Sequence, residues 1–195
     1  MITDISEVIT SEALKELHIN RDEELRAAFK RSLPFQDGLF DRWERAKRLG
    51  FGEGTSIYNS SCVYEKVSVG CHVWIGPNTL LDGMGGELII GDYSVISAGV
   101  QIYTHDTVLR TLSGGKYPMH RASVKIGKYC QIAPNAVISA GVEIGDRCLV
   151  AVNSFVNKSF PQNTIIGGCP AQKIGSVVID DENNIELIYS KDIYE

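Results

Sequence analysis

The sequence predicts an all-β solenoid, a parallel β-helix in which each turn of the chain stacks on the previous turn. A large apolar residue recurs at every sixth position, a period that fits neither an α-helix nor an alternating strand. Because the chain is 44% hydrophobic, fifteen such positions would all be apolar by chance with odds of about one in 10⁵. They are Phe51, Ile57, Val63, Val69, Ile75, Leu81, Ile90, Ile96, Ile102, Ile126, Ile132, Ile138, Ile144, Val150 and Val156.

Three hexads complete one triangular coil, so residues about 18 positions apart lie above one another and the repeat makes about five coils. Glycine often follows the apolar residue, and we expect it there because a tight corner favours a residue without a Cβ. These glycines are Gly52, Gly70, Gly76, Gly91, Gly127 and Gly145. The predicted stacked pairs are Ile126 on Ile144, Ile132 on Val150 and Ile138 on Val156.

The six-residue period fails at two places. The first is a short glycine-rich bulge that follows Asp82, from Gly83 to Gly86. The second is an inserted loop, residues 104–125, after which the period resumes at Ile126. A solenoid accepts insertions at its corners, and such insertions often carry function.

The ends of the chain are predicted to cover the open ends of the solenoid, which occupies residues 51–174. Residues 1–50 form a helical cap: Asn20 with Glu23 resembles a capping box that starts one helix, Pro34 ends it, and a second helix runs over about residues 38–49. Residues 175–195 form a capping tail, a hairpin with strands at 176–179 and 185–189.

Composition excludes several classes of protein. The formal net charge of −5 argues against a nucleic-acid partner, and no apolar run approaches the length of roughly 20 residues that spans a bilayer. The acidic start of the chain lacks a signal pattern, so we expect a cytoplasmic location. The five cysteines form no CxxC pair, and Cys130 and Cys148 share a hexad position, which favours reduced, buried thiols.

His105 is the strongest catalytic candidate because it lies three residues past Ile102, at the corner where the inserted loop leaves the solenoid. Histidine is the usual general base near neutral pH, although a loop histidine can also be exposed and without a task. His120, in the same loop, competes with it, whereas His72 fits a wall position. The sequence has no GxSxG nucleophile elbow and no glycine-rich phosphate loop.

Together, three features resemble the hexapeptide-repeat acyltransferases. They are the period of six, the loop that begins Tyr103-Thr-His-Asp106, and the ending VAVNSFVNKSFP (150–161) with GGCPAQK (167–173). Within that family, residues 51–175 most resemble sugar acetyltransferases such as galactoside and maltose acetyltransferase and those acting on surface polysaccharides. The resemblance implies a left-handed coil, a homotrimer with active sites between subunits, acetyl-CoA as donor, and a sugar or nucleotide-sugar acceptor.

The resemblance also assigns site residues. His105 matches the loop histidine that acts as the family's base. The family's CoA groove follows the late coils, where Lys158 would meet a CoA phosphate as a point charge. Pro134 replaces a serine whose backbone N–H faces the developing oxyanion in galactoside acetyltransferase, so another group must donate there. The predicted cofactor residues are Ala133, Pro134, Ala151, Val152, Asn157 and Lys158.

The expected reaction is direct acetyl transfer, with a hydroxyl acceptor favoured over an amine. His105 would take the acceptor's proton at Nε2, while Asp106 or a backbone carbonyl holds Nδ1. Asp82 and Tyr103 would help to shape the acceptor site. Two alternatives stay open: a non-catalytic scaffold or binding module, and a zinc lyase of the carbonic anhydrase type, for which no His-x-x-x-x-His pair exists. No metal is expected.

Overall fold

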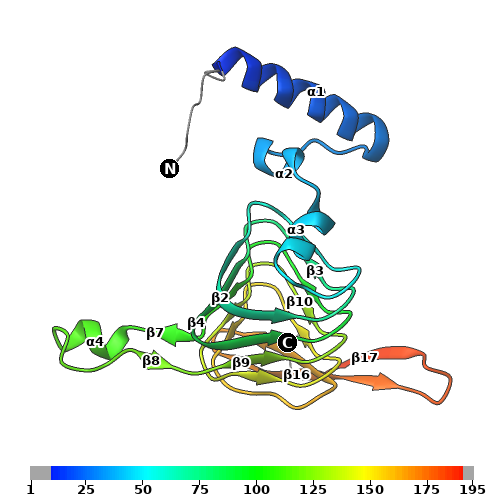
Figure 1. The fold of residues 1–195 in the computed structure, drawn as a ribbon. Coiled ribbons are helices and arrows are strands. Elements are labelled where there is room, and N and C mark those ends of the chain that lie inside the picture. Colours follow the sequence, from blue (N-terminus) through cyan, green and yellow to red (C-terminus); the bar gives the residue numbers. More distant parts are fainter. Residues whose placement is uncertain (1–9, 191–195) are drawn as a thin grey trace. The chain divides into compact units, whose positions relative to one another are not determined.

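The computed structural model describes residues 10–190, so the first residues of the predicted helical cap and residues 191–195 of the predicted tail lie outside it (Figure 1). The chain divides into two compact units, Met1–Asp41 and Arg42–Glu195, and each is described by itself. The smaller unit is helical, and the larger one holds the solenoid. Over residues 10–190, no helix has the length and apolar character that crossing a membrane requires.

The first unit contains helix α1 (Ser11–Phe29) and helix α2 (Phe35–Leu39). The predicted start at Asn20 is wrong, because Asn20 lies in the middle of α1. The helix begins instead at Thr10, whose hydroxyl accepts a hydrogen bond from the Ala13 N–H at 3.2 Å and so satisfies one free donor of the first turn. Lys30 ends α1 in a left-handed conformation, before Pro34.

The predicted second helix is split in two. Phe40 has an extended backbone after α2, and helix α3 (Arg42–Arg48) begins the second unit. α3 lies against the first coil: Ala46 is buried, and the Arg45 guanidinium donates to the carbonyl oxygens of Tyr58 and Ser61, the latter at 2.7 Å. The first coil is therefore covered by a helix.

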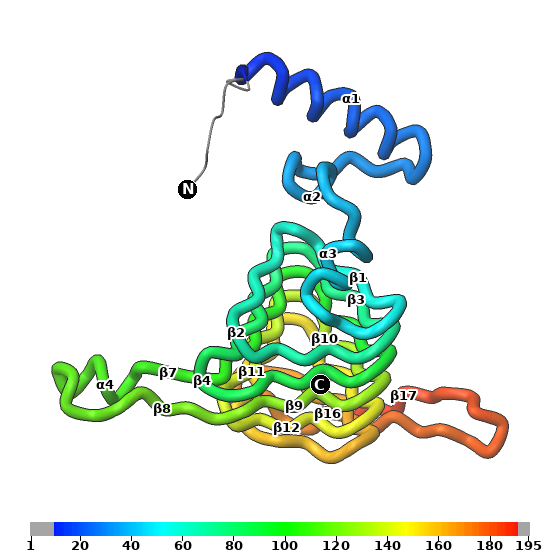
Figure 2. Tube along the Cα trace, viewed as in Figure 1, coloured from blue at the N-terminus to red at the C-terminus, as the bar shows by residue number. Residues whose placement is uncertain are grey.

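The solenoid is a triangular prism, and each of its three faces is a stack of parallel strands (Figure 2). We call these faces A, B and C, and along each coil the chain passes from A to B to C. Two long strands, β2 (Cys62–Val69) and β4 (Leu80–Ile90), run through a corner and contribute to both B and C. Face A stacks β1 (Ser56–Ile57), β3 (Trp74–Ile75), β5 (Val95–Ile96), β10 (Gln131–Ile132), β13 (Leu149–Val150) and β15 (Thr164–Gly168). Face B adds β6 (Gln101–Ile102), β11 (Val137–Ile138) and β14 (Phe155–Val156); face C adds β9 (Val124–Ile126) and β12 (Glu143–Ile144).

The apolar residues of the six-residue period fill the centre of the prism. All of them are buried except Val63, which is partly buried and packs against the core. The predicted coil-to-coil pairs are confirmed by the strand register: Ile126↔Ile144, Ile132↔Val150 and Ile138↔Val156. The solenoid has about six turns rather than about five, because β15 adds a rung to face A after the period ends.

The glycines after the apolar residues serve a different purpose from the one predicted. Gly91 and Gly127 do not have positive φ angles; instead, a Cβ on Gly91 would lie 2.7 Å from the carbonyl carbon of Gly127 on the next coil. They permit close stacking of coils. The left-handed conformations at the corners fall on other residues, among them Asn78, Asn135 and Asn153, with φ of 56°, 59° and 55°.

The predicted C-terminal hairpin is confirmed. Strand β16 (Ala171–Ile179) pairs antiparallel with β15 on one side and with β17 (Ile185–Tyr189) on the other. The pairing with β15 ends at Ser176, and the outer part of β16–β17 extends away from the prism (Figure 1). The hairpin therefore continues face A through the pairing of β16 with β15, and beyond Ser176 it is a two-stranded ribbon.

The two cysteines that share a hexad position are buried side chains. Cys130 is 1% exposed and Cys148 is 2% exposed. Burial raises the pKa of the Cys130 thiol to about 12 and also raises the pKa of Cys148, because a thiolate loses its hydration there. Cys62 and Cys169 are exposed.

Thiol labelling tests this placement. At pH 8, an aromatic disulfide reagent should modify Cys62 and Cys169 rapidly and leave Cys130 and Cys148 unmodified until denaturant is added, because only the thiolate reacts. Mass spectrometry of the labelled peptides assigns the sites. Rapid labelling of Cys130 in the folded protein would contradict the stacked core.

Replacing Ile132 with alanine should lower the free energy of unfolding by about 2–5 kcal/mol, because it opens a cavity between Ile96 and Val150 in a fully buried column. Denaturant unfolding followed by circular dichroism measures the loss. The matched control is Gln131→Ala, which alters the exposed neighbour on the same strand and should cost less than about 1 kcal/mol.

Candidate active site

The candidate site is built where the inserted loop leaves and re-enters the solenoid. The loop starts directly after β6 and returns to face C at β9. Its base is a two-stranded ribbon of β7 (His105–Asp106) and β8 (His120–Arg121), and its tip carries the short helix α4 (Val108–Leu112). Thr104, which precedes the ribbon, is fully buried and accepts a hydrogen bond from the Gly85 N–H at 2.9 Å. The loop is thereby tied to the coil above.

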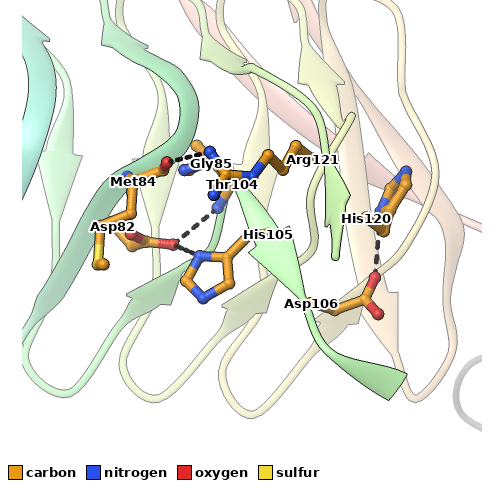
Figure 3. Close-up of polar contacts among 8 residues, drawn as sticks. All are labelled: Asp82, Met84, Gly85, Thr104, His105, Asp106, His120 and Arg121. Atoms are coloured by element: carbon orange, nitrogen blue, oxygen red, sulfur yellow. Dashed lines mark hydrogen bonds and ion pairs between the residues drawn. The ribbon is translucent and has the colours of Figure 1, made fainter. Parts of the chain in front are cut away.

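The ribbon places its side chains on two faces. Because neighbouring residues of a strand point to opposite sides, His105 lies on the face opposite to Asp106, and its register partner is Arg121. On that face, the Nδ1 atom of His105 lies 2.7 Å from Oδ2 of Asp82, which comes from β4 (Figure 3). The His105 side chain is about one-quarter exposed and the Asp82 side chain is 2% exposed. One ring nitrogen is thus held by a buried carboxylate.

Asp82 is itself held rigidly. Its Oδ1 accepts from the Met84 N–H at 2.9 Å, and its Oδ2 accepts from the Thr104 N–H at 3.2 Å as well as contacting His105. The glycine-rich bulge makes this arrangement possible: a Cβ on Gly83 would collide with the backbone of Lys66, and one on Gly85 would collide with Thr104. The bulge therefore aims the carboxylate at the loop histidine.

The prediction that Asp106 or a backbone carbonyl holds Nδ1 of His105 is wrong. Asp106 does not contact His105; its Oδ2 lies 3.0 Å from Nδ1 of His120, on the opposite face of the ribbon (Figure 3). This second pair is exposed, with side chains 55% and 47% accessible. The alternation of side chains along β7 is the physical reason, since it turns two consecutive residues to opposite sides.

A pocket of about 440 Å³ lies between the loop and face B. The loop contributes His105, and the fourth and fifth coils contribute an apolar and hydroxyl-bearing wall. The lining residues are Tyr103, His105, Asp106, Thr107, Val108, His120, Val137, Ser139, Ala140 and Phe155. This volume is typical of a small-molecule site.

The structure brings together only some of the predicted site residues. Tyr103 lines the pocket, and its hydroxyl lies 2.7 Å from Oε1 of Gln101. Asp82 holds His105 from behind. The six predicted cofactor residues do not line the pocket but lie at the two corners that border the late coils of face B: Ala133, Pro134, Ala151 and Val152 at one, Asn157 and Lys158 at the other.

The predicted phosphate-binding lysine has contacts within the chain. Nζ of Lys158 lies 2.5 Å from Oε1 of Gln172 and 5.6 Å from the centroid of the Phe160 ring. Pro134 accepts a hydrogen bond from Asn153 N–H through its carbonyl at 3.1 Å, so the proline corner is stacked regularly on the next coil. The side chain of Lys158 remains exposed.

Residues that the sequence analysis missed form the wall opposite the loop. Ser139 and Ala140 follow Ile138, and Val137 and Phe155 precede the buried positions of β11 and β14. The strand register explains their position: Ile138 pairs with Ile102, on the other side of the inserted loop, so the residues next to Ile138 lie beneath Tyr103. Ile102 and Ile138 are 36 residues apart, so a coil length of 18 residues did not predict this pairing.

Tyr64, which the sequence analysis did not identify, lies on the coil above the Asp82–His105 pair. A hydrogen bond with Cys62 raises the pKa of the Tyr64 hydroxyl, and the nearby Asp82 carboxylate raises it further. Tyr64 is 44% exposed and pairs in register with Asp82. A phenol that keeps its proton can donate a hydrogen bond at this surface.

Over residues 10–190, no three His, Cys, Asp or Glu side chains converge in a geometry that could bind a metal ion. His105 and His120, the two histidines of the inserted loop, each contact a carboxylate through Nδ1.

Comparison with known proteins agrees with this architecture. Residues 123–158 match the family model described as bacterial transferase hexapeptide (six repeats). WcaF of Escherichia coli K12, whose proposed role is that of an acetyltransferase in colanic acid biosynthesis, is 32% identical over 108 residues, which cover 54% of this chain and 56% of WcaF. The match therefore spans little more than half of that relative.

Two solved structures show the same fold over most of the chain. A hexapeptide-repeat-containing acetyltransferase of Vibrio cholerae O1 biovar eltor, in complex with acetyl coenzyme A, has a TM-score of 0.55 and 27% identity, covering 86% of this chain and 90% of that one. Galactoside acetyltransferase in complex with coenzyme A has a TM-score of 0.58 and 23% identity, covering 90% of this chain and 86% of that one. In its six-residue period, its stacked coils and the match of residues 123–158 to the family model, this chain is similar to the bacterial transferase hexapeptide family.

Proposed function

We propose that this protein transfers an acetyl group from acetyl-CoA to a hydroxyl group of a sugar or sugar-containing acceptor. One observation carries the proposal: a half-open histidine, His105, held at 2.7 Å by the buried carboxylate of Asp82, lines a pocket of small-molecule size. The acetyl-CoA complex of the Vibrio cholerae relative supports the choice of donor. The scaffold and zinc-lyase alternatives are not favoured by these relatives.

His105 acts as the general base. Asp82 accepts the hydrogen bond from the Nδ1–H group, which leaves the lone pair of Nε2 free to take a proton. As the acceptor oxygen attacks the thioester carbonyl, its proton passes to Nε2, and the imidazolium that forms is stabilised by the carboxylate. The proton then passes from Nε2 to the departing CoA thiolate, which restores the neutral histidine. Asp82 is a positioning residue in this scheme.

The donor lies along the late coils of face B. The predicted contacts at Ala133, Pro134, Ala151 and Val152 form one border of this face, and Asn157 with Lys158 forms the other. Lys158 is exposed and needs only to leave Gln172 to meet a phosphate. Pro134 supplies no N–H, so we place the oxyanion donor on the wall facing His105, where the Ser139 hydroxyl lines the pocket.

The acceptor lies on the opposite side of His105, toward the early coils. Tyr64 and Tyr103 flank Asp82 there and present hydroxyl groups suited to the hydroxyls of a sugar. A homotrimer, a cytoplasmic location and a preference for hydroxyl over amino acceptors complete the proposal. They are supported by the resemblance to sugar acetyltransferases.

Removing either His105 or the carboxylate of Asp82 should lower kcat without weakening the binding of acetyl-CoA. His105→Ala should reduce kcat about 10²–10⁴-fold because it removes the base. Asp82→Asn should reduce it at least about 10²-fold, because an amide can donate to Nδ1 and so favours the tautomer whose Nε2 carries the proton. Release of CoA thiol measures turnover, and calorimetry with CoA measures binding.

The matched controls come from the exposed pair on the other face of the ribbon. His120→Ala and Asp106→Asn change the same residue types in the same pocket but do not touch His105, so each should change kcat less than about tenfold. The assignment fails if His105→Ala keeps its turnover, or if the controls lose as much activity as the variants of the pair. Loss of CoA binding in H105A would mean that His105 is structural.

A panel of free sugars, amino sugars and nucleotide sugars tests the acceptor class. With acetyl-CoA present, hydroxyl acceptors should release CoA thiol faster than their amino analogues, and Tyr64→Phe should raise the KM for the best acceptor without changing CoA affinity. Release confined to amino sugars would overturn O-acetylation and leave acetyl transfer intact. No release with any acceptor, together with no CoA binding, would favour a scaffold.

A further inference from the structure

We propose that Arg121 binds an anionic group of the acceptor, so that the preferred acceptors are acidic sugars, which carry a carboxylate or a phosphate. This inference rests on the proposed acetyl transfer, because it names the acceptor class of the same site. The observation that carries it is an arginine that lies beside the His105 base and forms no ion pair within residues 10–190.

Arg121 lies on the same face of the loop ribbon as His105. The two residues are register partners in β8 and β7, and the side chains of such partners leave a ribbon on the same side, with Cβ atoms about 5 Å apart. The Arg121 side chain extends toward the glycine-rich bulge, where its Nη1 atom lies 3.4 Å from the carbonyl oxygen of Met84 (Figure 3). A planar cation therefore lies next to the bulge that aims Asp82 at His105.

The carboxylates of this region are already engaged by other groups. Asp82 is 2% exposed, and its oxygens contact two backbone N–H groups and the ring of His105. Asp106 contacts His120 on the opposite face of the ribbon. Glu87, which follows the bulge, accepts a hydrogen bond of 3.1 Å from a serine hydroxyl of β2. These contacts leave the charge of the arginine available to a ligand.

The guanidinium of Arg121 has free donors. It is exposed, and the Met84 carbonyl can accept from only one of its N–H groups. Lys125, four residues further along the chain, differs in this respect, because its ammonium forms an ion pair with Glu143 at 3.2 Å. An exposed arginine is ordinary by itself, but one beside a catalytic base can hold a carboxylate or phosphate through paired hydrogen bonds.

The bulge between the two side chains provides a surface on which a sugar can lie. Three of the four residues in the range 83–86 are glycine, so Met84 supplies the only side chain of the bulge. Met84 is 46% exposed, and its flexible thioether suits the C–H groups of a sugar ring. A sugar on this surface would present a hydroxyl group to Nε2 of His105 and its anionic group to Arg121.

Charge and position both favour the acceptor over the donor as the partner of Arg121. The chain has a formal net charge of −5, so its overall field repels an acidic sugar and a local cation must supply the attraction. The predicted donor contacts lie at the corners of the late coils, whereas Arg121 contacts the bulge of β4, which belongs to an early coil.

Calorimetric binding of matched sugars tests the proposal without relying on turnover. Methyl glucuronoside carries a carboxylate where methyl glucoside has a hydroxymethyl group, and glucose 1-phosphate places the charge on a phosphate. With CoA present, the wild-type protein should bind one of the anionic sugars about 10–100-fold more tightly than methyl glucoside. Arg121→Gln should remove this preference, and Arg121→Lys should restore part of it, because lysine keeps the charge but not the planar fork.

The matched control is Lys116→Gln, which removes one positive charge from the same loop, between α4 and β8, away from the ribbon. It should keep the preference for the anionic sugar, which separates a local contact from general electrostatic attraction. All variants should bind CoA with the affinity of the wild type. In acetyl-transfer assays, R121Q should raise the KM for the anionic sugar about 10–100-fold and leave the KM for methyl glucoside within about twofold.

Each outcome has a distinct meaning. A preference for glucuronoside identifies a uronic acid as the acceptor, and a preference for glucose 1-phosphate identifies a sugar phosphate. The proposal is overturned if the wild type binds neither anionic sugar more tightly than methyl glucoside, if R121Q keeps the preference, or if R121Q loses CoA binding, which would assign the arginine to the donor. A preference that depends on Arg121, together with no acetyl transfer to any sugar, would overturn the proposed function and leave the anion site standing.

Discussion

The stacking of coil on coil is the constraint on which the rest of this structure depends. Most strands of the faces are only two residues long, so they are not stable by themselves, and their backbone hydrogen bonds are made with the coils above and below. The columns of buried isoleucine and valine hold those rungs in register, and glycines such as Gly91 and Gly127 let the coils come close enough to bond. A residue at a given corner is therefore placed by the coils on either side of it.

The candidate site uses this rigidity and one local break in it. Asp82 comes from the second coil and His105 from the third, and the glycine-rich bulge lets the two meet at 2.7 Å. The buried carboxylate of Asp82 makes three hydrogen-bond contacts and therefore cannot move far. The solenoid thus sets the orientation of the His105 imidazole, although His105 itself lies at the start of the inserted loop. The opposing wall, with Ser139 and Phe155, belongs to the fourth and fifth coils. Four successive coils of the prism thus contribute to one site.

The inserted loop and the C-terminal hairpin show how a solenoid acquires features that its repeat cannot supply. Both extend from corners, where an insertion does not disturb the stacked faces. Both carry exposed apolar side chains, and their charges are opposite in sign.

Sequence alone determined the architecture, because a six-residue period of apolar residues has one simple physical solution and identifies its own core. The period by itself pairs Ile132 with Val150, and the strand register agrees. It also located His105, at the point where that period stops. Only the tertiary structure decided which carboxylate holds His105. Asp106 is adjacent in sequence but turned to the other face of the ribbon, whereas Asp82 lies 23 positions earlier and directly beside it. Contacts across coils depend on the exact length of each turn, and the bulge and the inserted loop shift that length in ways that spacing along the chain does not reveal.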